Sequence, residues 1–455
     1  MNNIMANALD LTIKIHKLGY DAYIIGGAVR DLMLNKTPSD VDISTNCPIN
    51  ILQSNFDTFF VGNSQKYNTV VILYYGVPYE VTQFREEQDY DGANPAKVVF
   101  VSSLASDVKR RDFTINSMAM NYDGNIIDHE GGKRDIELQL IKAVGDPDKR
   151  FTEDYVRMIR AARFAALDGF KIESNTAESI KKNAHLITQV TPERINLEIV
   201  KAFKKSGQEA AKFILNLDEL MLLHYILPEV ENLKNFIHNP DHHPEGPTVF
   251  DHTIECLKLS TSHMGYVTKL SILLHDIGKP PSATPKEGSI YPSYSRHESI
   301  GAEMAYEILL RYKFSVQVME SVTFAVSNHM KFHNILDMKP SKIMKLVCNP
   351  DYAVLKDTAW ADEFSRGEKF SHYGDFENKL KLINELTDKW KSNIKGNEIK
   401  IVNGSRIMNV LNIPQGPLVG IIKSAVEEHI IDNSLQPTQE ELDIIITNIR
   451  KSLAD

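Results

Sequence analysis

The sequence predicts an α+β multidomain protein with a mixed sheet-and-helix head, followed by domains built of helices alone. At 455 residues the chain is too long for one hydrophobic core. Strand patterns are confined to the first part, where "TVVILYYGVPYEVTQF" (69–84) predicts a hairpin with Gly76 and Pro78 near its turn. From about Phe151, apolar residues recur at helical spacing almost without interruption.

The composition is that of a soluble globular protein. Apolar residues make up 42% and charged residues 24%, and no apolar run approaches the roughly 20 residues of a membrane span. The net charge of −9 restricts nucleic-acid binding to local basic patches. Three scattered cysteines (Cys47, Cys256 and Cys348) form neither a disulfide framework nor a zinc pattern. We therefore expect a reducing cytoplasm.

The head begins with alternating helices and short strands. Residues 1 to about 20 predict an amphipathic helix, and "DAYIIGG" (21–27) a buried strand that ends in a glycine turn. "AVRDLMLN" (28–35) predicts a helix and "SDVDIST" (39–45) a strand. Domain boundaries are expected near 144–151, near 239–247 and between 370 and 400.

One segment of the head combines glycines with closely spaced carboxylates. Gly26 and Gly27 would let a triphosphate approach the backbone at a helix N-terminus, and Arg30 could add a charged contact. Asp40 and Asp42 fall on one face of a strand, and oxygen ligands of this kind suit Mg²⁺. Taken singly, these features are typical of a capping turn and a solvated strand edge. Together they favour a nucleotide site, with Glu80 either a third carboxylate or a surface residue.

This combination resembles the DNA polymerase β-like nucleotidyltransferase superfamily, and longer motifs narrow the resemblance. "KRRDFTINSMAM" (109–120) and "EDYVRMIRAARFAALDGF" (153–170) are similar to hallmark segments of class II tRNA nucleotidyltransferases, the CCA-adding enzymes. "TPERINLEI" (191–199) and "IMNVLNIPQGPLVG" (407–420) resemble later parts of the same family. The resemblance implies Mg²⁺ ligation by the catalytic Asp40 and Asp42. It also implies nucleotide contacts from Gly27, Arg30, Arg111, Asp154, Arg157, Arg160 and Arg163.

The residue chemistry gives one of these implied contacts a physical reason. On a helix, Asp154 and Arg157 would be i,i+3 neighbours, which could be a plain salt bridge. An acceptor beside a donor also matches the amine and ring nitrogen shared by cytosine and adenine. Such a pair would admit CTP and ATP and reject UTP and GTP. Arg160 and Arg163 could reach phosphate, or form a solvated stripe.

Some residues depart from the family pattern. Asn68 occupies a place where many relatives have glycine. In the loop "DYDGANPAKVVF" (89–100), Ala93 and Asn94 replace a basic pair. In this family that loop is tied to the switch from C to A addition, so the sequence leaves the end product open.

A second group of residues that could bind a metal ion follows later in the sequence. "HHPEGPTVFDHT" (242–253) precedes "LLHDIGKP" (273–280), and together with Asp362 these motifs resemble an HD phosphohydrolase domain. A His-Asp pair inside an apolar helix is costly without a partner. The expected ligands of Ni²⁺, Co²⁺ or Mn²⁺ are His252, His275, Asp276 and Asp362. His297 and His329 would support a second ion or be ordinary surface residues, and a metal-free degenerate domain is the alternative.

The resemblance implies four parts. Residues 1–147 would form the nucleotidyltransferase head, 148–238 the neck and body, 239–370 the HD domain and 371–455 a helical tail. The expected function is addition of CCA to the 3′ end of tRNA, with contacts to the acceptor arm and no membrane partner. A CC-adding, A-adding or poly(A) enzyme is the alternative, as is an HD phosphohydrolase that uses the front half to bind RNA. The oligomeric state stays open.

Overall fold

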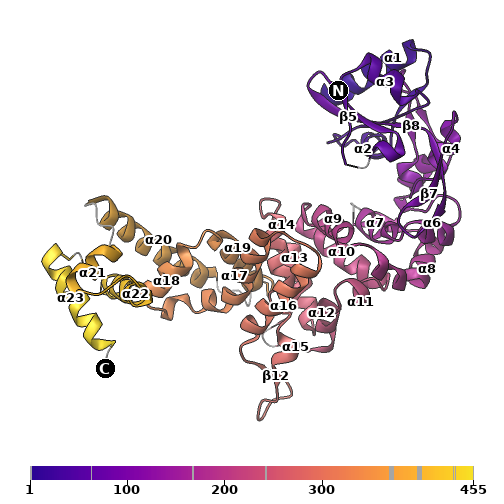
Figure 1. Cartoon of the computed structure of the whole chain (residues 1–455). Coiled ribbons are helices and arrows are strands. Elements are labelled where there is room, and N and C mark those ends of the chain that lie inside the picture. The colour runs from indigo at the N-terminus through magenta and orange to yellow at the C-terminus, as the bar shows by residue number, and fades with distance from the viewer. Residues whose placement is uncertain are drawn as a thin grey trace. The chain divides into compact units, whose positions relative to one another are not determined.

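The structure is a computed structural model (Figure 1) that describes residues 3–62, 64–166, 169–240, 243–367, 373–396, 402–433, 435 and 437–453. The chain divides into two compact units. The first comprises Met1–Glu231 with Arg311–Lys313, and the second comprises Asn232–Leu310 with Phe314–Asp455. The predicted boundary at 370/371 lies outside the described residues, and the predicted four-part division stays a prediction.

The first unit is built around a mixed sheet in the order β3-β4-β5-β2-β1-β8-β9, in which only β2 and β5 pair in parallel. The sheet strands are β1 (Ala22–Ile25), β2 (Asp42–Thr45), β3 (Thr58–Phe59), β4 (Thr69–Tyr74), β5 (Val77–Gln83), β8 (Ala119–Met120) and β9 (Ile126–Ile127). Two smaller pairs are β6 (Arg85–Tyr90) with β7 (Pro95–Phe100), and β10 (Leu140–Ile141) with β11 (Lys171–Ile172).

Helices precede, interrupt and follow this sheet. In the head they are α1 (Asn3–Lys17), α2 (Gly27–Met33), α3 (Ile49–Asn55), α4 (Leu104–Lys109) and α5 (Gly132–Glu137). After the sheet they are α6 (Pro147–Glu153), α7 (Val156–Ala165), α8 (Ser174–Asn183), α9 (Pro192–Phe203), α10 (Gly207–Glu219), α11 (Leu223–Ile226) and α12 (Pro228–Glu231).

Local sequence explains the elements of the head. Helix α1 buries Met5, Ala8, Leu11 and Ile15, whose spacing of three and four residues makes one apolar stripe. The predicted hairpin is present, and its turn has positive φ at Tyr75 (48°) and Gly76 (74°). This backbone matches the twist of the paired strands β4 and β5.

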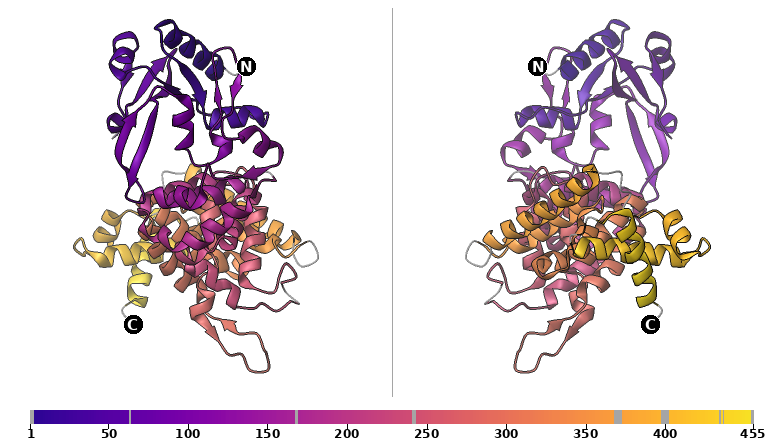
Figure 2. Two further views of the ribbon diagram at one scale, coloured as in Figure 1. Left: turned by 90° about the vertical axis from the view of Figure 1, so that its right-hand side faces the viewer. Right: turned by 90° about the vertical axis from the view of Figure 1, so that its left-hand side faces the viewer.

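The second unit is helical, as predicted, apart from one short hairpin. Its helices are α13 (Val249–Leu259), α14 (Tyr266–Leu274), α15 (Lys279–Ser282), α16 (His297–Arg311), α17 (Val316–His333), α18 (Pro340–Val347), α19 (Tyr352–Phe364), α20 (Tyr373–Gly396), α21 (Gly404–Leu411), α22 (Pro417–Asp432) and α23 (Gln439–Ser452). Strands β12 (Ala283–Thr284) and β13 (Ser293–Tyr294) form the hairpin, whose loop projects away from the neighbouring helices (Figure 2).

Two apolar clusters organise these helices. One joins α17, α18, α19 and the start of α20, with Phe332, Leu355 and Phe376 buried at its centre. The other lies among α21, α22 and α23 and includes Ile407 and Ile422. Helix α20 therefore packs on the same core as α17 and α19, which carry predicted HD-site residues. Among the described residues, no helix has the length and hydropathy of a membrane span.

Candidate functional sites

The carboxylates of the head gather where strand β2 begins beside the middle of strand β5. In the parallel pair β2–β5, Ile43 lies opposite Val81, so the preceding residues Asp42 and Glu80 are level with each other and point to one face. Partial desolvation and the neighbouring Glu80 raise the pKa of Asp42 to about 6 although the residue is exposed, and Asp40 adds to the increase while Arg111 opposes it. Strand β2 begins at Asp42, so Asp40 lies just before it and not within the strand as predicted. The three carboxylates repel one another, which suits a bound divalent cation.

The glycine turn lies beside Arg111, a partly buried arginine. Gly26 has a φ of 72°, and a Cβ at this position would lie 3.2 Å from Nη1 of Arg111. Positive φ and the close approach together explain the glycine. Nε of Arg111 is buried and has no hydrogen-bond partner among the described residues. Burial lowers the pKa of Arg111, while the charge of Asp42 counteracts that shift. An orphaned donor of this kind fits an anionic ligand.

Three predicted nucleotide-contacting arginines meet around one aromatic ring. The guanidinium carbons of Arg30, Arg160 and Arg163 lie 5.0, 5.2 and 4.3 Å from the ring centroid of Phe164. Phe164 belongs to α7, as do Arg160 and Arg163, whereas Arg30 comes from α2. The structure therefore brings these arginines together, and the solvated stripe is wrong as an account of them.

A hydrogen-bond network holds this arginine cluster in place. Arg30 donates to Oδ1 of Asn116 at 2.8 Å, and Asn116 donates to Asp112 at 3.2 Å. Arg160 donates to Asp112 at 2.8 Å, and Arg163 donates to Glu198 at 2.5 Å. Burial alone would raise the pKa of Asp112, but Arg160 and Asn116 lower it to about 2. Sequence reasoning missed Asp112, although it directly follows the predicted Arg111.

The predicted helical pair of Asp154 and Arg157 is wrong in its local geometry. Helix α6 ends at Glu153, Asp154 has extended backbone (φ −145°, ψ 105°), and α7 begins at Val156. Asp154 accepts from Arg194 at 2.7 Å. Arg157 instead pairs with Glu153 at 2.9 Å.

A hairpin that is distant in sequence contacts the chain at the break between α6 and α7. Gly92, at the tip of the β6–β7 hairpin, bridges to Asp154, and its carbonyl accepts from the backbone of Tyr155 at 2.9 Å. A Cβ at Gly92 would lie 2.1 Å from the Tyr155 ring. Ala93 and Asn94, the residues that depart from the family pattern, donate their backbone N–H groups to Asp91 at 3.0 and 2.7 Å. These two positions therefore shape the tip that contacts Asp154.

In the second unit, the Nδ1 atom of each of four buried histidines contacts an oxygen atom, and the Nε2 atoms are directed at other candidate ligands. Nδ1 contacts the carbonyl of Ile272 in His275, of Tyr294 in His297 and of Val326 in His329, at 2.8, 2.8 and 2.7 Å. Nδ1 of His252 contacts the Glu245 carboxylate at 2.6 Å. Because a carbonyl only accepts, each Nδ1 that faces one must donate, which leaves a lone pair on Nε2 of the neutral ring.

These lone pairs converge on one another and on two aspartates. Nε2 of His297 lies 3.2 Å from Nε2 of His329. Nε2 of His252 lies 3.1 Å from Asp362, and Nε2 of His275 lies 3.2 Å from Asp276. Nε2 of His275 is buried with no hydrogen-bond partner among the described residues. Facing lone pairs beside carboxylates fit divalent metal ions.

The ligand atoms form two adjoining groups. His252, Cys256, His275 and Asp362 make one, and Asp276, His297 and His329 make the other, with the ligand atoms of each group within 4.8 Å of one another. The expected ligands His252, His275, Asp276 and Asp362 are thus brought together. All of them are buried, so His297 and His329 are not surface residues. His275 and Asp276 directly follow α14 instead of lying inside it.

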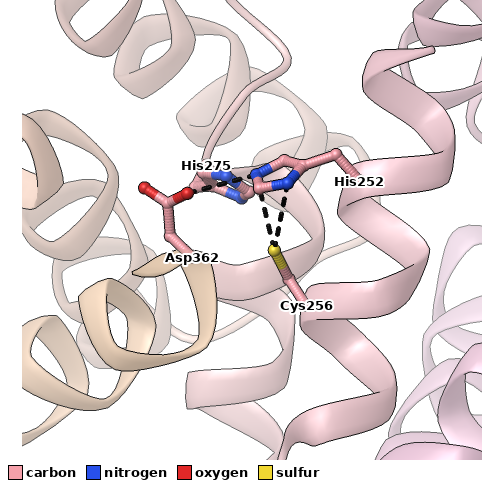
Figure 3. Close-up of side chains that lie close together, drawn as sticks. All are labelled: His252, Cys256, His275 and Asp362. Atoms are coloured by element: carbon pink, nitrogen blue, oxygen red, sulfur yellow. Dashed lines mark hydrogen bonds and ion pairs between the residues drawn. The ribbon is translucent and has the colours of Figure 1, made fainter. Parts of the chain in front are cut away.

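Sequence reasoning missed Cys256, although its position four residues after His252 would have been a usable signal. Figure 3 shows the Asp362 carboxylate and the Cys256 sulfur approaching the His252 ring from different sides. The sulfur lies 3.5 Å from Nε2 and 3.9 Å from Nδ1 of that ring. Because these distances are nearly equal, the sulfur lies beside the ring and not along the Nε2 lone pair.

A cavity of about 580 Å³ opens onto these groups. Asp276, His297, His329 and Asp362 line it, as do cationic side chains of α15, α17 and α20. His333 contacts Asp362 at 2.7 Å. Burial would lower the pKa of His333, but Asp362 raises it to about 9. The cavity therefore joins candidate metal ligands to positive charge.

Comparison with known proteins agrees with this organisation. Residues 22–142 match the family described as Poly A polymerase head domain, 169–234 match "Probable RNA and SrmB- binding site of polymerase A", and 249–367 match the HD domain. The fold and the two sites thus define a nucleotidyltransferase head joined to an HD domain.

Similar sequences and structures narrow the class. The chain is 44% identical to a CCA-adding enzyme of Bacillus pumilus over 217 residues, which is 47% of this chain and 54% of that protein. It is 45% identical to one of Lactobacillus johnsonii over 210 residues, 46% of this chain and 52% of that protein. The chain thus spans about half the length of the curated relatives it matches.

A solved structure of the Bacillus stearothermophilus CCA-adding enzyme in complex with CTP is 25% identical, has a TM-score of 0.71, and covers 100% of this chain and 99% of its own. The Thermotoga maritima enzyme complexed with tRNA shares the fold at a TM-score of 0.60 and 18% identity, covering 100% of this chain and 96% of its own. The similarity to CCA-adding enzymes in both sequence and fold agrees with the resemblance predicted from the motifs of the chain.

Proposed function

We propose that this protein adds the 3′-terminal CCA sequence to tRNA from CTP and ATP, without a nucleic-acid template. The observation that carries the proposal is the carboxylate cluster of Asp40, Asp42 and Glu80 beside the Gly26 turn and the partly buried Arg111. Relatives named CCA-adding enzymes, one of them solved with CTP, support the substrates. Three unpaired cysteines suit a reducing cytoplasm.

Some residues of the head would bind the metal ion, and others would bind the triphosphate. Asp40 and Asp42 would hold Mg²⁺, with Glu80 supporting them as a third carboxylate. Bound there, Mg²⁺ would neutralise the triphosphate and lower the pKa of the attacking 3′-hydroxyl. Gly27, Arg30 and Arg111 would bind the phosphates. Arg160 and Arg163, fixed by Asp112 and Glu198, would hold the nucleotide from the α7 side.

Asp154 and Arg157 would select the base although they do not pair with each other. Arg157 uses three of its five N–H groups on Glu153 and on the carbonyls of Arg150 and Arg110, which leaves two donors. Each oxygen of Asp154 accepts one hydrogen bond, from Val156 or Arg194, and keeps a second lone pair. The ion pairs with Glu153 and Arg194 would orient the two side chains for the base edge.

The test of this function is a primer-extension assay. A tRNA that ends at the discriminator base is incubated with CTP and ATP, and its 3′ end is sequenced. We expect C, C and A to be added in that order by the single chain. Addition of CC alone, of A alone or of a poly(A) tract would identify one of the other activities, and the Asp40→Ala, Asp42→Ala variant serves as the inactive control.

A second activity is favoured by the convergence of imidazole Nε2 atoms in the HD cavity. We propose that His252, His275, Asp276 and Asp362 hold Ni²⁺, Co²⁺ or Mn²⁺, with His297 and His329 supporting a second ion. Such an ion polarises a phosphoryl oxygen and supplies hydroxide near neutral pH. Glu245 would hold His252 in the tautomer that leaves Nε2 free. The reaction class is hydrolysis of a phosphate ester, with a cyclic phosphate at an RNA end as the expected substrate.

A further inference from the structure

The cavity that is lined by Asp276, His297, His329 and Asp362, here called the HD cavity, is also lined by cationic side chains. Metal binding alone does not account for these cations. The cavity has a volume of about 580 Å³, within the range of roughly 300–1,000 Å³ that small-ligand sites occupy. Candidate metal ligands line it together with Arg366, which follows α19, and Lys379 of α20. A single phosphate at the metal ligands would not require this second group of cations.

Lys379 is held in the cavity by the packing of its helix. Phe376, three residues earlier and on the same side of α20, is buried against Phe332 and Phe364, with ring centroids 5.4 and 5.5 Å apart. Lys379 itself is only 7% exposed. The same apolar contacts that attach α20 therefore fix the place of the lysine stem.

The structure gives the ammonium group of Lys379 no partner among the residues that it describes. Among the described residues it makes no hydrogen bond and has no carboxylate within 4.0 Å, although Asp337 and Asp375 also line the cavity. A lysine that is more than nine-tenths buried is normally paired, because an uncompensated charge away from bulk water is costly. Its position on a cavity wall points to an anion that binds from within the cavity.

Arg366 provides a second donor of the same kind. Its Nε is buried and without a hydrogen-bond partner among the residues that the structure describes. Its closest carboxylate oxygens, of Asp362 and Glu363, lie 3.7 and 4.0 Å from Nη2, longer than a charge-assisted hydrogen bond. The guanidinium therefore keeps hydrogen-bonding capacity for a ligand oxygen.

We propose that Lys379 and Arg366 bind a second phosphate of the HD substrate, separate from the phosphate at the metal ligands. The preferred substrate class would then be a nucleotide with phosphate on both sides of its sugar. The last nucleotide of an RNA has this form when it carries a 3′- or cyclic phosphate. This proposal rests on the proposed phosphohydrolase activity, and it makes Lys379 a specificity-determining residue.

Binding is the primary test, because it does not depend on turnover. Isothermal titration compares adenosine 3′,5′-bisphosphate with adenosine 3′-phosphate on the full chain. We expect the bisphosphate to bind roughly tenfold tighter, the order of one charge-assisted hydrogen bond. Lys379→Gln should reduce this preference to near unity, and Lys379→Arg should retain it. Equal affinities in the parent protein, or an equal loss for both ligands in Lys379→Gln, would overturn the proposal.

A matched control lies two residues further along α20. Lys381 is exposed and does not line the cavity, so Lys381→Gln makes the same charge change on the same helix and should leave both affinities unchanged. If Lys381→Gln lowers the preference as much as Lys379→Gln, the effect belongs to overall charge and the subsite is refuted.

Hydrolysis separates this inference from the activity on which it rests. The parent protein should cleave the cyclic phosphate of a dinucleotide with a higher kcat/KM than that of adenosine 2′,3′-cyclic phosphate, and Lys379→Gln should raise KM only for the dinucleotide. If neither ester is cleaved with Ni²⁺, Co²⁺ or Mn²⁺, the phosphohydrolase proposal fails. A Lys379-dependent preference for the bisphosphate would still establish the anion subsite.

Discussion

The head site and the HD site differ in the side chains that accompany their carboxylates, which are arginines in the head and mainly histidines in the HD site. In the head, carboxylates and arginines pair with each other, as in the chain from Arg30 through Asn116 and Asp112 to Arg160. In the HD site, imidazole rings also face one another directly, with Nε2 of His297 3.2 Å from Nε2 of His329. The first arrangement prepares a surface for a charged nucleotide. The second arrangement brings together nitrogen and oxygen atoms of the kind that bind divalent metal ions.

The two sites should also prefer different metal ions, because their ligand atoms differ. Asp40, Asp42 and Glu80 offer oxygen alone, which suits Mg²⁺. The HD groups combine imidazole nitrogen with carboxylate, which suits first-row transition metals better. The two activities should therefore respond independently to metal replacement and to mutation.

The largest effect should come from removing one set of carboxylates. Asp40→Ala with Asp42→Ala should lower CTP incorporation by roughly a thousandfold or more, since a catalytic ion contributes several kcal/mol of charge stabilisation. The same variant should release phosphate from a cyclic-phosphate end at the parental rate. Radiolabelled CTP incorporation and phosphate release are measured on one preparation.

The reverse variant completes this test. His275→Ala with Asp276→Ala should abolish phosphate release and lower the content of transition metal, measured by mass spectrometry. CTP and ATP incorporation should stay within about twofold of the parent. Loss of both activities in either double variant would show that the sites are coupled, and the contrast drawn here would fail.

Local pattern was enough to predict elements that depend on neighbours in sequence. The stripe of Met5, Ala8, Leu11 and Ile15 marks α1 without tertiary information, and the glycine before Val77 marks a turn. The face of the strand on which the Asp42 carboxylate lies could be predicted, because side chains along a strand alternate between its two faces.

Features that depend on distant contacts could not be predicted. At the break between α6 and α7, Asp154 bridges to the backbone of Gly92 in the distant β6–β7 hairpin. The pairing of Arg160 with Asp112 spans 48 residues, and that of His297 with His329 spans 32. The helical periodicity of the sequence therefore led to the wrong prediction that Asp154 lies on a continuous helix. That His297 is buried could be seen only in the structure.

A smaller effect should distinguish base reading from phosphate binding within the head. Asp154→Ala with Arg157→Ala should reduce discrimination of CTP against UTP by roughly 5- to 150-fold, because a bidentate base contact is worth about 1–3 kcal/mol. The ratio of kcat/KM values for the two nucleotides measures this. Arg194→Ala removes only the ion pair that orients Asp154, so it should lower the discrimination by less than the double variant does. An unchanged ratio in the double variant would assign these residues to structure alone.

The smallest effect concerns the stability of the paired network in the head. Asp112→Asn should lower the free energy of unfolding of the first unit by about 1–2 kcal/mol at pH 7. This is the value of a pKa held at about 2 instead of 3.8, discounted because Arg160 is partly exposed. Since the folded pKa is lowered, the stabilisation is full above pH 3.8 and is lost as pH falls toward 2. The difference between parent and variant should therefore be constant from pH 7 to about 5 and shrink below about 4. Urea unfolding followed by circular dichroism measures this difference in the free energy of unfolding.

Tryptophan fluorescence is an internal control. The protein's two tryptophans, Trp360 and Trp390, both belong to the second unit, so their unfolding midpoint should not move. A difference that persists unchanged at pH 3 would show that Asp112 acts through packing and not through its charge.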